Sequence, residues 1–158
     1  MQDLNRKSSL LNSMQAEHTQ LEALLSKLSD EQLLRPGATG SWSVKDVLAH
    51  ITWWEQTVIS ETLHGVELDP GLGEEPWSLE RANTLMVEAK RDTPLPEILA
   101  AFHASYLQIL QMVEGLSDTE LARDELYTHL INNTWQHYAE HRHWIEDELN
   151  LSGSPTTP

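Results

Sequence analysis

Apolar residues recur along this chain at intervals of three, four or seven, and nowhere do they alternate with polar residues for long. That period places the apolar side chains on one face of an α-helix, whereas alternation would indicate half-buried strands. Four long segments carry such an apolar stripe, so the sequence predicts an all-α fold. The stripes consist of Leu4, Leu11, Met14, His18, Leu21, Leu25 and Leu28; Val44, Val47, Leu48, Ile51, Trp54 and Val58; Ile98, Leu99, Phe102, Tyr106, Ile109, Met112 and Val113; and Ile131, Tyr138, Ile145 and Leu149.

Residues that favour helix ends bound the second and third stripes. The second helix is expected to begin at Ser43 and to stop at Gly65, and the third to begin at Thr93-Pro94 and to stop at Gly115. A serine side chain can cap a helix start, proline is tolerated in a first turn, and glycine suits the residue that follows a helix.

The connection between these two helices is long. Residues 65–77 are rich in glycine and proline, and Ser78 can cap a short helix that runs to about Arg91. Four long helices with one long crossover predict a four-helix bundle. The bundle is expected to form one domain over residues 1–151, and the small, proline-rich tail from 152 to 158 is expected to be disordered.

A short motif occurs twice. Leu28-Ser-Asp-Glu-Gln-Leu33 follows the first long helix, and Leu116-Ser-Asp-Thr-Glu-Leu121 follows the third. In each, a serine precedes a Gln or Glu by three residues, which is the pattern of a capping box. The repeat indicates either two independent helix caps or a pseudo-twofold pairing of helices.

Charge and cysteine content narrow the possible partners and chemistry. Ten Lys and Arg residues stand against 25 Asp and Glu residues, for a net charge of −15, and there is no cysteine. A field of that sign repels phosphate, so we expect no nucleic acid and no membrane surface as a partner. Metal ligands must come from His, Asp and Glu. The chain has no apolar run long enough to cross a bilayer and no signal-peptide core at its N-terminus, which predicts a cytoplasmic protein.

Three of the eight histidines fall where they could share a metal ion. His137 and His141 are four residues apart, so their rings lie one above the other on a helix face. At about 100° per residue, both flank Tyr138 at the centre of the buried face, and His50 lies at the edge of the core face of the second helix. The three imidazoles could meet between two helices with a fourth position open, as in catalytic zinc sites. Alternatively, the histidines near the C-terminus belong to a polar, exposed segment.

A second metal motif competes with this one. Glu61-x-x-His64 and Glu140-x-x-His143 repeat the Glu-x-x-His spacing of di-iron carboxylate bundles. The same helical geometry places Glu140, His143 and His64 outside their apolar stripes and towards solvent, where they cannot share a buried metal pair. We therefore favour the three-histidine site.

Several other residues allow both a structural and a functional interpretation. His18 falls within an apolar stripe, as a hydrogen-bonded core histidine or as a fourth ligand. Glu55 and Arg142 both project towards the core and could neutralise each other, or Glu55 could line a cavity as a base. His103 and His129 fit no pattern. The six tryptophans are expected to pack in the core, or to wall an apolar pocket over the metal.

The motifs around these histidines resemble those of a known family. Gly40-Ser-Trp42-Ser43-Val-Lys-Asp46-Val-Leu-Ala-His50, followed by Trp54-Glu55, resembles the second-helix motif of the DinB/YfiT-like superfamily. The last-helix motif of that superfamily is similar to His137-x-x-x-His141-Arg142. The resemblance covers nearly the whole folded chain, and it is greatest to the ClbS/DfsB branch. That branch is indicated by Trp42-Ser-Val-Lys-Asp46, Asn83, Leu95-Pro-Glu-Ile98 and Asn133-Thr-Trp-Gln-His137-Tyr138-x-x-His141.

The resemblance implies an up-down-down-up four-helix bundle, often a homodimer, in which His50, His137 and His141 bind a divalent metal. Activities in the superfamily are metal-dependent transferases and isomerases, frequently thiol-linked, and hydrolases. The ClbS/DfsB branch includes a protein that protects cells from a genotoxic metabolite by hydrolytic opening of a cyclopropane ring.

We therefore expect a metal-dependent hydrolase or thiol-linked transferase that acts on a small organic, possibly toxic, molecule. His50, His137 and His141 would hold the metal, zinc first and nickel, iron or manganese as alternatives. Glu55 or Tyr138 would orient water or assist proton transfer. A different class of function is a binding protein that sequesters a small molecule without converting it, and a third is a structural dimer.

Overall fold

The computed structural model describes residues 3–152 and is all-α over that range, which confirms the predicted fold class. Its helices are α1 (Asp3–Leu25), α2 (Asp30–Leu34), α3 (Val44–His64), α4 (Leu79–Ala89), α5 (Leu95–Gly115), α6 (Asp118–Leu121), α7 (Asp124–Asn133) and α8 (Trp135–Ser152). Within the described residues the one β-type pairing is an isolated bridge between Thr39 and Trp42.

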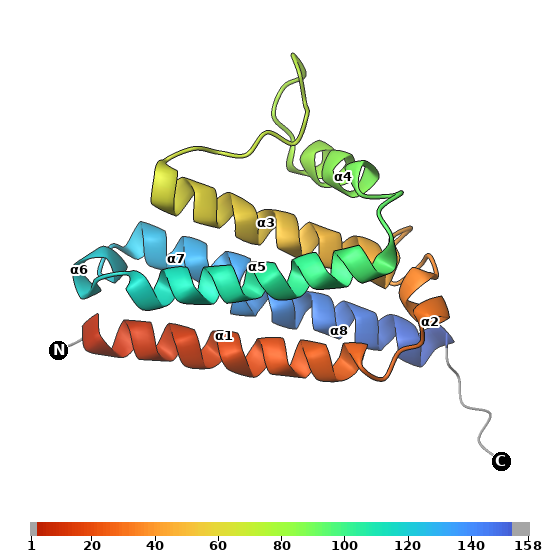
Figure 1. Cartoon of the computed structure of the whole chain (residues 1–158), viewed down its shortest axis with the longest axis horizontal. Helices are drawn as coiled ribbons and strands as arrows, with labels where there is room; N and C mark the ends of the chain where they lie inside the picture. Colours follow the sequence, from red (N-terminus) through yellow and green to blue (C-terminus); the bar gives the residue numbers. More distant parts are fainter. Residues whose placement is uncertain (1–2, 153–158) are drawn as a thin grey trace.

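The long helices lie side by side (Figure 1). The helix α1 and the α7–α8 pair run in one direction, and α3 and α5 run in the opposite one, which is the up-down-down-up order. α3 packs mainly against α5, and α1 packs mainly against α8. The chain from α3 to α5 returns along the outside of the bundle and carries α4, which packs on α3. This return is the long crossover that the glycines and prolines predict.

Two apolar clusters fill the interior from end to end. One contains Leu21, Val47, Ile51, Phe102 and Tyr138, among others, and the other contains Met14, Val58, Ile109 and Leu130. Most of the buried members belong to the predicted stripes, so the helical period in the sequence identified the larger part of the core. The stripes did not include Leu10, Leu33, Ala49, Leu95, Leu116, Leu121 and Leu130. Leu4 was predicted to lie in the core, but its side chain is outside the part of the chain that the structure describes. The same holds for residues 153–158, which were predicted as a disordered tail. Ser152, the first residue of that predicted tail, instead belongs to the end of α8.

The predicted ends of α3 are confirmed. Ser43 Oγ accepts from the Asp46 amide at 3.1 Å, and Asp46 Oδ2 accepts from the Ser43 amide at 3.0 Å, which completes a capping box. Gly65 ends the helix with φ +67°, in the left-handed region that favours glycine. These ends fix the register of α3, and with it the position of His50.

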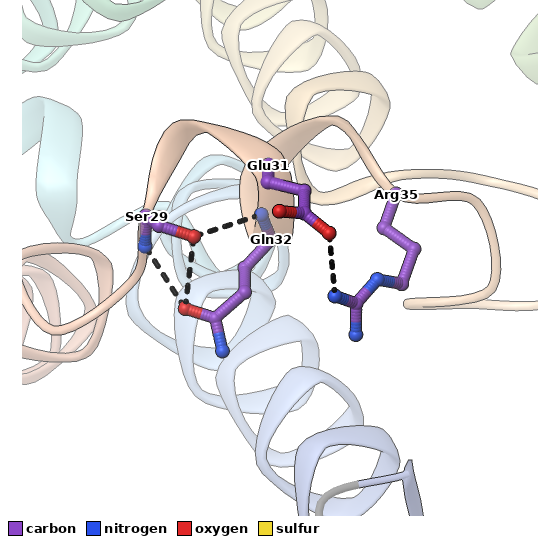
Figure 2. Close-up of polar contacts among 4 residues, drawn as sticks. All are labelled: Ser29, Glu31, Gln32 and Arg35. Atoms are coloured by element: carbon purple, nitrogen blue, oxygen red, sulfur yellow. Dashed lines mark hydrogen bonds and ion pairs between the residues drawn. The ribbon is translucent and has the colours of Figure 1, made fainter.

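The repeated motif forms a helix cap at both places. Ser29 and Gln32 cap α2 reciprocally, and Figure 2 shows this contact beside the exposed pair Glu31–Arg35. Ser117 and Glu120 do the same for α6. The two short helices lie at opposite ends of the molecule (Figure 1), and a pseudo-twofold relation between them stays a prediction.

The last long helix differs from the expectation, because it is broken into α7 and α8. Thr134 adopts φ −120° and ψ −107°, outside helical values. Its hydroxyl donates to the Leu130 carbonyl oxygen at 2.6 Å, so a side chain occupies an acceptor at the break, as threonine within a helix can do. The break lies three residues before His137.

Candidate metal centre

Three histidines from two helices bring their Nε2 atoms together. The Nε2 atom of His137 on α8 is 2.9 Å from the Nε2 atom of His50 on α3 and 2.9 Å from that of His141 on α8. One donor atom from each ring lies within 4.8 Å of the others. Two nitrogens that share a tetrahedral zinc ion lie about 3.3 Å apart, so the cluster has about the size of a three-imidazole metal site.

Hydrogen bonding among the rings does not satisfy this cluster. A neutral imidazole nitrogen offers either one hydrogen or one lone pair, so the Nε2 atom of His137 cannot form a full hydrogen bond with both neighbours. The Nδ1 atoms of all three rings are buried and have no hydrogen-bond partner among the described residues. A cation that accepts three Nε2 lone pairs would resolve the conflict at the Nε2 atoms, although it would not supply an acceptor for the Nδ1 atoms. The three Nε2 atoms therefore fit a metal.

Burial keeps the three rings neutral. It lowers the pKa of His50 to about 3, that of His137 to about 4 and that of His141 to about 2. The other imidazoles of the cluster contribute to these low values at His50 and His141, because two positive charges at this separation would repel each other. Neutral rings carry the free lone pairs that metal binding requires.

The cluster opens into a cavity of about 640 Å³ between α3, α4 and α8. The side chains around the three histidines are mostly aromatic or amide groups. The lining comprises Thr39, Gly40, Ser41, Trp42, His50, Trp54, Leu79, Asn83, Asn132, Asn133, His137, Glu140, His141 and Trp144. A volume of this size is typical of small-molecule sites.

Three tryptophans surround the imidazoles. The ring centroids of Trp42 and His50 lie 5.2 Å apart, and those of Trp144 and His141 lie 4.9 Å apart. Trp54 contacts His50 edge-on at 6.5 Å, and its indole nitrogen donates to Asn83 Oδ1 at 2.9 Å. This hydrogen bond joins α3 to α4 at the cavity wall.

The predicted catalytic residues, Glu55 and Tyr138, lie in the core and do not line this cavity. The Tyr138 hydroxyl donates to Glu55 Oε2, whereas Glu55 Oε1 has no hydrogen-bond partner among the described residues. Burial raises the pKa of Glu55 to about 8, against the opposing effect of the Tyr138 hydroxyl. The pair links α3 to α8, the two helices that supply the cluster.

Arg142 does not pair with Glu55, one of the alternatives that the sequence left open. It binds Glu17 on α1 and Glu146 on α8, each at 3.1 Å. The motif His141-Arg142 thus joins a cluster residue to an arginine that fastens α8 to α1.

His18 is a core histidine and lies outside the cluster. Its ring stacks on Tyr106 at 3.5 Å between centroids and on Phe102 at 5.2 Å. Burial lowers the pKa of His18 to about 4. Of the two histidines that fit no pattern, His103 contacts Glu22 and His129 contacts Glu61, each at 2.8 Å.

The two Glu-x-x-His motifs do not converge. Glu61 pairs with His129, while His64 and His143 are exposed. Glu140 is exposed, as expected, but it also lines the cavity that contains His137 and His141, a position that the sequence analysis did not assign to it. One helical turn separates it from His137, and that i, i+3 spacing was the signal that could have identified it.

A family comparison covers most of the chain. The family model described as the DinB superfamily matches residues 14–148. The chain belongs to the DinB superfamily. The match includes α3 and most of α8, with all three histidines of the cluster. Among curated proteins, by contrast, none matches this DinB-superfamily chain in sequence.

Solved structures of other proteins share the DinB fold of this chain. DfsB, described as a sibling lethal factor precursor, has a TM-score of 0.77 at 15% identity, over 96% of this chain and 98% of that one. The colibactin self-resistance protein ClbS, in complex with dsDNA, has a TM-score of 0.76 at 16% identity, over 96% and 97%. An uncharacterised protein from Escherichia coli UTI89 has a TM-score of 0.75 at 15% identity, over 93% and 94%.

The ClbS complex corrects one of our expectations. From the net charge of −15 we excluded nucleic acid as a partner, yet a protein of this fold was crystallised with dsDNA. The exclusion is therefore wrong as reasoned. Net charge sums over the whole surface and sets the long-range field, whereas a contact depends on the groups at one place. The ClbS complex does not bear on our expectation that the protein has no membrane surface as a partner. No helix among the described residues is long and apolar enough to cross a membrane.

Proposed function

We propose that this protein is a metal-dependent enzyme that converts a small organic molecule in the cavity beside the three histidines. The observation that carries the proposal is the convergence of three buried, neutral Nε2 atoms, from His50, His137 and His141, at the wall of a cavity large enough for a substrate. Metal binding in many DinB-superfamily proteins supports it.

The three histidines would hold the metal, and zinc is our first assignment, with nickel, iron or manganese as alternatives. A bound divalent ion would supply Lewis acidity, which activates water or polarises a substrate group at neutral pH. Both a hydrolase and a transferase that uses a low-molecular-weight thiol could work at such a site. Since the chain has no cysteine, the thiol would come from outside.

We propose positioning roles for Glu55 and Tyr138, because neither lines the cavity. Their contact joins α3 to α8 inside the core, and so helps to hold His50 opposite His137 and His141. The cavity walls, meanwhile, exclude water from one side of the cluster and orient the substrate.

The neighbours suggest the biological setting. ClbS is described as a self-resistance protein, and we propose by analogy that this chain protects its cell from a toxic small molecule. Because ClbS was crystallised with dsDNA, duplex DNA belongs among the ligands to be tested, by fluorescence anisotropy at two salt concentrations.

A comparison of wild-type protein with the double variant His137→Ala/His141→Ala tests this proposal. Each protein, purified without a nickel column and supplied with zinc, is incubated with a library of small electrophiles and esters, and substrate and product are followed by mass spectrometry. We expect wild type to convert at least one compound over many turnovers, and the variant to lose that activity by about a hundredfold or more. Circular dichroism verifies that the variant is folded.

The same experiment distinguishes the alternative function. If the protein only sequesters its ligand, a compound disappears from solution in stoichiometric amount, returns unchanged when the protein is denatured, and binds the variant equally well. That result, or turnover that survives in the folded double variant, would reject the proposed metal-dependent enzyme.

A further inference from the structure

We infer that the cavity beside the histidine cluster selects a small organic cation that carries an aromatic ring, such as an aryl-substituted amine. This inference rests on the proposed function, since it takes that cavity as the substrate site. It concerns the part of the substrate that lies against the cavity walls rather than the part that reacts.

The walls favour an aromatic body. Trp42, Trp54 and Trp144 all line the cavity, and each ring contacts one of the histidines. The Trp144 side chain is 41% exposed, and Leu79, which also lines the cavity, is 56% exposed. Apolar surface is therefore available to a ligand. Indole rings gain from contact with another aromatic ring beyond the area they bury.

The charges favour a cation. Glu140 is the one carboxylate among the lining residues that the structure describes, and none of those residues is Lys or Arg. The Arg142 side chain next to His141 is bound to Glu17 and Glu146 and does not line the cavity. An ammonium group thus finds a carboxylate and electron-rich indole rings, whereas a carboxylate group finds no cationic side chain.

The proposal has a consequence for the reaction type. A thiol co-substrate that carries carboxylate groups would find no cationic side chain in the cavity to bind those groups. Water needs no such partner. Of the two chemistries left open above, the walls therefore favour a hydrolytic one.

Three naphthalene probes of similar size and different charge test the selection: 2-naphthylmethylammonium, 2-naphthylmethanol and 2-naphthoate. Their dissociation constants are measured by isothermal titration calorimetry, with protein that has been treated with chelator and desalted and with zinc-loaded protein. The metal-free series isolates the walls, because a bound cation would itself attract the carboxylate. We expect the ammonium to bind metal-free protein about tenfold more tightly than the carboxylate, with the alcohol between them.

Two pairs of variants assign the effect to the walls. Glu140→Gln should bring the ammonium and the alcohol to nearly equal affinity, whereas Asp147→Asn, which removes an exposed carboxylate from α8 outside the cavity, should not. Trp144→Leu should weaken all three probes several-fold, whereas Trp77→Leu, which removes an exposed tryptophan outside the cavity, should leave them unchanged.

The inference fails if metal-free protein binds the carboxylate as tightly as the ammonium, or if Glu140→Gln behaves like Asp147→Asn. This failure is distinct from failure of the proposed function. A protein that binds no metal and still prefers the ammonium refutes the enzyme and keeps the selective cavity, and a protein that binds zinc without any preference does the reverse.

Discussion

Replacement of His137 by alanine is expected to lower the zinc affinity of this protein more than a hundredfold. The Nε2 atom of His137 lies 2.9 Å from those of both His50 and His141, so its loss removes the central member of the cluster. Loss of a group that merely orients a ligand costs about ten- to a hundredfold, and loss of a ligand should exceed that. Competition with a chromophoric chelator measures the affinity.

Thermal denaturation gives a second readout for the same change. Zinc at about a hundred times its dissociation constant should stabilise wild type by about 3 kcal/mol and should leave His137→Ala nearly unchanged. The control is His143→Ala, an exposed histidine on the same helix, which should respond to zinc as wild type does. Equal zinc affinity in His137→Ala and wild type would show that the cluster is not the metal site.

Replacement of Glu55 by glutamine is expected to make the protein more stable at pH 8 but not at pH 4. Burial raises the pKa of Glu55 from 4.5 to about 8 in the folded chain. Between these values the unfolded chain loses a proton that the folded chain keeps, so the stability of wild type falls as pH rises. Glutamine has no proton to lose, and the difference between the two proteins should grow to about 4 kcal/mol across this window.

Urea denaturation of both proteins at several pH values measures the two free energies of unfolding. The effects of all other titrating groups cancel in the difference, because both proteins share those groups. Tyr138→Phe is the companion variant. It leaves Glu55 Oε2 without its hydrogen-bond donor and should destabilise the protein by about 1–3 kcal/mol. A stability difference between Glu55→Gln and wild type that does not change with pH would mean that Glu55 is ionised in the folded core.

The fold follows from sequence where local chemistry decides it. The apolar stripes predict which faces are buried, and Ser43 with Asp46 and Gly65 predict where α3 begins and ends. The break at Thr134 was not predictable in the same way, because neither proline nor glycine marks it. Threonine is tolerated within helices, and whether its hydroxyl competes for a backbone acceptor depends on the surrounding packing.

The site was predictable as far as helix geometry reaches. The i, i+4 spacing of His137 and His141 places two rings on one face of a helix, and His50 joins them because α3 and α8 cross there. Partners across helices were not predictable. Glu55 projects inward, as expected, but only the packing shows that it contacts Tyr138 rather than Arg142. The position of Glu140 in the cavity wall was not predicted. Helix geometry places Glu140 outside the buried face of α8, whereas the cavity lies at the edge of that face.

The central claim is that His50, His137 and His141 bind a metal ion. The most direct test is metal analysis of wild-type protein that was made without a polyhistidine tag and purified without a nickel column. After equilibrium dialysis against zinc, elemental analysis should find one zinc ion per chain in wild type and almost none in the triple variant His50→Ala/His137→Ala/His141→Ala. Wild type without stoichiometric metal, or a triple variant that retains as much zinc, would contradict the account.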